Sequence, residues 1–62
     1  MKEWIANAVG AMHVHKISQV ELAKHLGIRN DYLNSILAGR RSPKGAEERI
    51  LTAIDEIIAS RR

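Results

Sequence analysis

The chain has only 62 residues and no cysteine, so packing alone must hold whatever fold it adopts. Without thiols there is no disulfide framework, and no zinc site or nucleophile built from cysteine. A chain of this length forms one small core, which makes residues 1–62 a single domain. A ligand pocket of about 300 Å³ would remove much of that core. We therefore expect neither an enzyme nor a cofactor or small-molecule site.

Charge and hydropathy limit the partners. Ten Lys and Arg against seven Asp and Glu give a formal charge of +3, which favours a polyanion without requiring one. No run approaches the roughly 20 apolar residues of a membrane span, and Glu3 and Trp4 stand where a signal peptide carries basic residues. We expect a cytoplasmic protein with no membrane partner. His13 and His15 would point to different faces of a helix, which argues against a metal site.

Apolar residues recur at helical spacing along the chain, and no segment alternates like a strand. The pattern predicts an all-α fold, with Val9 and Val20 among the apolar positions of the first two helices. The expected helices run from Lys2 to about His15, from Gln19 to Leu26, from Asn30 or Asp31 to the residue before Gly39, and from Pro43, capped by Ser42, to about Ser60.

The start of the second helix carries a specific local signal. The Ser18 hydroxyl can accept from the Glu21 N–H while the Glu21 carboxylate reaches back to the Ser18 N–H, which is a capping box. Ile17 and Leu22 have the spacing of a hydrophobic staple, and Gly27 favours the left-handed geometry that ends a helix. These signals predict a helix of about two turns.

Two short helices joined by a glycine-containing turn form a helix-turn-helix, here at residues 19–38. Counting from Gln19, Ala23 at the fifth place lets the helices cross closely, and Gly27 at the ninth accepts a positive φ. Apolar residues occupy the fourth, eighth, tenth, fifteenth and eighteenth places, which are Leu22, Leu26, Ile28, Leu33 and Ile36. This set would lock the second helix of the motif onto its scaffold.

The ungapped run SQVELAKHLGIRNDYLNSILAGRRSP, from Ser18 to Pro43, resembles the lambda-repressor-like helix-turn-helix family of phage and bacterial regulators. The resemblance implies a compact lambda-repressor-like domain of four helices, or five as is usual in the family, whose third helix enters the DNA major groove. Lys16 stands where the family often has glycine. Either this lysine adopts left-handed geometry or the loop follows another course.

The resemblance also implies roles for individual side chains. Those facing DNA base edges would be Asn30, Asp31, Asn34 and Ser35, with Arg29 at the edge of the set. Those contacting phosphates would be Gln19, Tyr32, Arg40, Arg41 and Lys44. Two of the base-facing residues have simpler structural alternatives, because Asp31 is favoured by the helix dipole and Asn30 is a good N-cap.

The last helix bears on assembly. Ile54, Ile57 and Ile58 extend its apolar stripe beyond the length that the second and third helices can cover. Either its end packs inside the monomer or its last turns pair with a second copy. We expect a homodimer, with these three residues at its interface.

Together these features predict a sequence-specific, double-stranded DNA-binding transcriptional regulator, a repressor or Cro-like protein acting as a homodimer on a short palindromic operator. The alternative is a small helical adaptor that uses the same scaffold to bind another protein. Uncharged polar residues at the exposed positions and flanking arginines suit DNA better than a flat protein interface.

Overall fold

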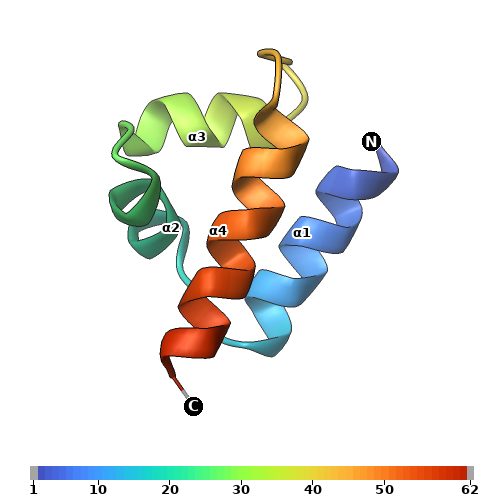
Figure 1. Cartoon of the computed structure of the whole chain (residues 1–62). Coiled ribbons are helices and arrows are strands. Elements are labelled where there is room, and N and C mark those ends of the chain that lie inside the picture. Colours follow the sequence, from blue (N-terminus) through green and yellow to red (C-terminus); the bar gives the residue numbers. More distant parts are fainter. Residues whose placement is uncertain (1, 62) are drawn as a thin grey trace.

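The computed structural model describes residues 2–61, and all of their regular secondary structure is helical (Figure 1). The helices are α1 (Glu3–Val14), α2 (Gln19–Leu26), α3 (Asn30–Leu37) and α4 (Ala46–Ser60). The all-α prediction is therefore confirmed, with four helices in the described part of the chain. None of these four helices has the length and apolar character of a membrane span.

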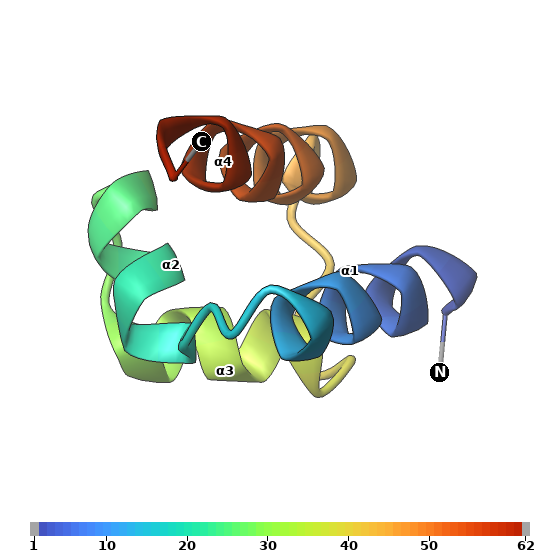
Figure 2. The same cartoon turned by 90° about the horizontal axis from the view of Figure 1, so that it is seen from below.

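The helices enclose one apolar core. α4 packs against α1 and α2, and α2 packs against α3. Figure 2 shows α4 along one side of the molecule, α1 and α3 along the other, and α2 between them. The core side chains are Ile5, Ala8, Met12, Ile17, Leu22, Ala23, Leu33, Ile36, Leu37, Ala46, Ile50, Ala53, Ile54 and Ile57. Full burial of each large member contributes about 1.5–3 kcal/mol before the cost of ordering the chain.

The start of α2 agrees with half of the predicted capping box. Ser18 Oγ accepts from the Glu21 N–H at 3.0 Å, and Gly27 ends the helix with φ 73°. The second half of the prediction is wrong, because the Glu21 carboxylate accepts instead from Arg61 Nη2, at 2.6 and 2.7 Å. A guanidinium offers a carboxylate charge-assisted bonds that are stronger than a single backbone N–H. Arg61 also donates to the His15 carbonyl, so the end of α4 is tied both to the end of α1 and to the start of α2.

Replacing Ser18 with alanine should lower the free energy of unfolding by about 1 kcal/mol, because the Glu21 N–H loses its acceptor. Chemical denaturation measures the change. Ser60→Ala is the matched control, because the Ser60 hydroxyl only donates to the Ile57 carbonyl of its own helix. Equal effects of the two substitutions would contradict the cap.

Left-handed geometry at Lys16 ends α1. Lys16 has φ 54°, the Ile17 N–H donates to the Met12 carbonyl at 2.8 Å, and the Lys16 N–H donates to the His13 carbonyl at 3.3 Å. This is the Schellman motif, with lysine where glycine is usual, and the left-handed conformation costs about 1–2 kcal/mol for a residue with a Cβ. The buried Ile17 side chain offsets that cost by joining the core.

The predicted start of α4 at Pro43 is wrong. The helix begins at Ala46, after Gly45 has taken φ 80°, and the Ala46 N–H donates to the Pro43 carbonyl at 3.1 Å. Ser42 does not cap the helix, since its hydroxyl accepts from Lys2 Nζ at 3.0 Å. Proline and serine are as typical of turns as of helix starts, and the positive φ at Gly45 breaks the helix between Pro43 and Ala46.

Two apolar positions predicted to face the core lie on the surface. Val9 is 41% exposed and Val20 is 61% exposed. Val9 is turned by about 100° around α1 from the buried Ala8, and Val20 by about 160° around α2 from the buried Leu22, so both lie at or beyond the edge of the buried stripe of their helix. A two-turn helix such as α2 has room for only a narrow buried stripe.

The C-terminal half of α4 also needs a correction. Ile54 and Ile57 are 2% and 4% exposed within the single chain, so placing them on an uncovered apolar stripe was wrong. α1 lies alongside α4 and, with α2, covers the length that α2 and α3 alone would leave bare (Figure 1). Of the three isoleucines, only Ile58 is half-buried and retains surface for another molecule.

Candidate nucleic-acid interface

One side of α3 is held in the core and the other is presented to solvent. Leu33, Ile36 and Leu37 are the buried side chains of this helix. The rest of the helix carries the polar and aromatic residues Asn30, Asp31, Tyr32, Asn34 and Ser35, of which Ser35 is half-buried and the others exposed. The four residues with predicted base contacts on α3 are therefore all on its accessible part.

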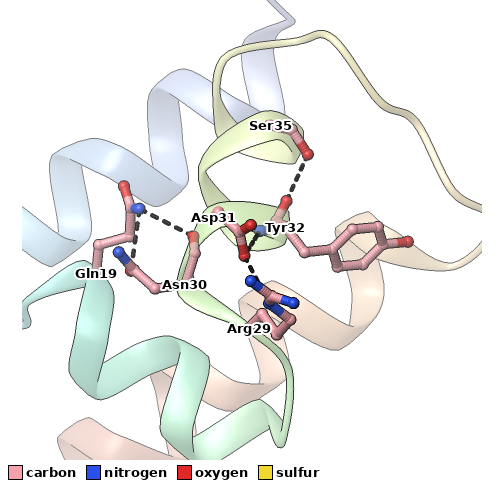
Figure 3. Close-up of polar contacts among 6 residues, drawn as sticks. All are labelled: Gln19, Arg29, Asn30, Asp31, Tyr32 and Ser35. Carbon is pink, nitrogen blue, oxygen red and sulfur yellow. Dashed lines mark hydrogen bonds and ion pairs between the residues drawn. The ribbon is translucent and has the colours of Figure 1, made fainter.

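A side-chain link joins the first residues of α2 and α3. Gln19 Nε2 donates to Asn30 Oδ1 at 3.1 Å and to the Asn30 carbonyl at 3.3 Å (Figure 3). The Asn30 side chain thus bonds to α2 rather than capping α3, and Arg29 holds the N-cap position without a side-chain cap bond. The capping alternative for Asn30 is wrong. The link fixes the Asn30 amide, whose NH₂ group keeps its donor capacity.

Asp31 and Arg29 form an exposed pair at the start of α3. Asp31 Oδ1 accepts from Arg29 Nε at 3.1 Å and from the Tyr32 N–H at 3.0 Å (Figure 3). The carboxylate therefore has a local role at the positive end of the helix dipole. An exposed ion pair of this kind contributes at most about 1 kcal/mol, so it can open readily when a stronger partner arrives.

The loop after α3 is fastened to the helix by its backbone. The N–H groups of Arg40 and Arg41 both donate to the Ser35 carbonyl, at 2.9 and 3.2 Å, after Gly39 has turned the chain with φ 83°. The Arg41 guanidinium lies over the Tyr32 ring, 5.6 Å from its centroid, in a cation–π contact. Two predicted phosphate-binding side chains are thereby held together beside α3.

These side chains outline a shallow depression of about 300 Å³. Its lining is Arg29, Asp31, Tyr32, Ser35 and Arg41. Lys44 lies nearby, because it lines a small cavity of about 40 Å³ together with Tyr32. In the segment from residue 29 to residue 44 there are four basic side chains and one carboxylate, that of Asp31. The surface around α3 is therefore basic, as the predicted phosphate contacts require.

Each of these polar and basic side chains was predicted from the sequence, but the contacts between them were not. Gln19 and Asn30 were each predicted to touch DNA, yet their mutual bond was not foreseen. The same holds for Tyr32 and Arg41. An aromatic residue facing an arginine across a glycine turn was the available signal for the second contact.

Residues 2–61 contain no cluster of three His, Cys, Asp or Glu residues that could hold a metal ion.

Comparison of the chain with family models, with curated proteins and with solved structures gives no match. The functional interpretation therefore depends on the motif residues and on the geometry around α3.

Proposed function

We propose that this chain is a sequence-specific regulator that binds double-stranded DNA, in which α2 and α3 form a lambda-repressor-like helix-turn-helix. The observation that carries the proposal is the division of α3 into two faces. Its apolar side chains pack in the core, its polar side chains are exposed or half-buried, and basic residues flank it at both ends. A helix of this kind is suited to reading base edges in the major groove.

The side chains divide into two groups by chemistry. Asn34, Ser35 and the NH₂ group of Asn30 are hydrogen-bonding groups for base edges, with Arg29 and Asp31 at the margin. Arg40, Arg41 and Lys44 carry the charges that neutralise phosphates, and Gln19 lies at the start of α2, where backbone N–H groups also favour an anion. The stacking of Arg41 on Tyr32 reduces the freedom that this arginine loses on binding.

The adaptor alternative fits the α3 face less well. Protein interfaces are built around aromatic or aliphatic anchors that become fully buried. Tyr32, at 36% exposed, is the one large hydrophobic residue that α3 presents, and Arg41 already lies over its ring. A polar, basic surface with a single covered aromatic residue favours a nucleic-acid duplex.

Selection of bound sequences from random duplex DNA tests the proposal. With a selected site in hand, Asn34→Ala should relax the preference at one base-pair position by about 1–3 kcal/mol, because the adenine-type bidentate contact is lost. Competition binding with single-base variants of the site measures this. Ser60 lies at the far end of α4, so Ser60→Ala should leave the base-pair preference unchanged. A pool with no enriched sequence would favour the adaptor.

We further propose a homodimer on a two-fold symmetric site, because one short helix reads few base pairs and paired half-sites lie about 34 Å apart. Ile58→Glu should leave the chain folded, since Ile58 is half-buried, and should lower affinity for the palindrome by about tenfold or more. Sedimentation measures the oligomeric state, circular dichroism shows whether the chain is folded, and DNA titration measures the affinity. A parent chain that binds its best site strictly one to one would contradict the dimer.

A further inference from the structure

A second surface lies on α4 and the start of α1, and none of the predicted DNA contacts belongs to it. It is a groove of about 650 Å³. Its lining includes Lys2 and Trp4 at the start of α1 and Glu47, Glu48, Leu51 and Asp55 on α4. Trp4 from α1 and Leu51 from α4 are half-buried and pack against the core, so they give the groove an apolar floor. An aromatic and an aliphatic side chain side by side are typical anchors of a docking site.

The walls of this groove are acidic. Glu47, Glu48 and Asp55 line it, whereas the one basic lining residue is Lys2, whose ammonium donates to Ser42. Within residues 2–61 the other α4 carboxylate, that of Glu56, pairs with His25 outside the groove at 2.8 Å. No ion pair of the described residues involves the three groove carboxylates. A net-positive chain therefore gathers unpaired negative charge around an apolar floor.

The helix dipole explains only part of this arrangement. Glu47 and Glu48 stand in the first turn of α4, where the dipole favours carboxylates. Asp55 lies about two turns further on, beyond the reach of that effect. A second copy docking by two-fold symmetry through this groove would bring the same acidic walls together, and like charges disfavour such an interface. DNA is excluded by the same sign of charge.

We propose that the groove docks a basic amphipathic helix of a partner protein. Apolar side chains of that helix, at positions three or four apart, cover Trp4 and Leu51, while its lysines and arginines pair with Glu47, Glu48 and Asp55. The apolar floor and the acidic walls of the groove both favour this occupant. The inference does not depend on the proposed DNA binding, because the two surfaces share no predicted contact residue.

Trp4 is the only tryptophan of the chain, so its fluorescence reports on the groove directly. The probe is a synthetic helical peptide with leucines on one face and lysines on the other. We expect it to shift the Trp4 emission saturably to shorter wavelength, as the ring leaves water. A matched peptide with glutamate in place of every lysine should bind at least about tenfold more weakly.

Reversing the charge of the groove carboxylates tests whether they bind the peptide. The double variant Glu47→Lys with Asp55→Lys should weaken the lysine peptide by at least about fivefold, because two attractive pairs become repulsive. Glu56→Lys makes the same kind of change on the same helix outside the groove and should have little effect. Three results would overturn the proposal: no saturable shift, equal binding of both peptides, or equal weakening by the control. So would a Trp4 emission that changes with protein concentration alone, which would assign the groove to a second copy.

Discussion

Replacing Arg40 and Arg41 together with alanine should weaken binding to every duplex sequence by about 10- to 100-fold. Both residues lie in the turn that follows α3, and both of their backbone N–H groups donate to the Ser35 carbonyl. The loss of two phosphate contacts should also flatten the plot of log affinity against log salt by about two units, since each contact releases about one counterion. Fluorescence anisotropy at several salt concentrations measures both quantities.

The matched control removes the same charge elsewhere. Lys16, just after α1, and Lys24 on α2 are exposed and have no predicted DNA contact, and their double alanine variant has the same net charge as the test variant. It should keep the parent slope. If both double variants lose the same affinity, binding depends on overall charge, and the assigned face around α3 is wrong.

Leu33→Ala should lower the free energy of unfolding by about 2–5 kcal/mol. The Leu33 side chain is 0% exposed and is one of three that hold α3 on the core. Because a domain of this size has a total stability of about 3–9 kcal/mol, a large fraction of the variant should be unfolded at room temperature. Urea titration followed by circular dichroism measures the loss.

Val20→Ala tests whether that loss comes from burial. Val20 is also an aliphatic residue of the motif, but it is 61% exposed. Its truncation should change the free energy of unfolding by less than about 0.5 kcal/mol. A Val20 effect as large as that of Leu33 would mean that the outer side of α2 is covered by another part of the protein.

Helix boundaries were predictable where a signal is local. Ser18 and Gly27 mark the two ends of α2 by chemistry that acts within three residues, and both boundaries were predicted correctly. Pro43 failed as the start of α4 because proline and serine suit a turn as well as a first helical turn. The structure resolves this ambiguity at Gly45, whose positive φ separates the loop from the helix.

Contacts between distant residues were not predictable. The Glu21 carboxylate was predicted to accept from the backbone at the start of its own helix. It accepts instead from Arg61, 40 residues further along the chain. Ile57 was assigned to an exposed stripe because the pattern of α4 does not reveal that α1 lies beside it. On α3 the helical period of the apolar residues was enough to predict which side chains are accessible, since the residues between Leu33 and Ile36 had to face outward. Which side chains were candidates could thus be predicted, but their mutual contacts could not.

The proposed function requires duplex DNA to bind the outer side of α3. A titration of the ¹⁵N-labelled chain with a duplex, followed by amide chemical shifts, tests it residue by residue. We expect the largest shifts at Gln19, Asn34, Arg40 and Arg41, and no shift at Glu47 and Asp55 in the acidic groove. Shifts confined to the groove, or none at low salt with the folded chain, would contradict it.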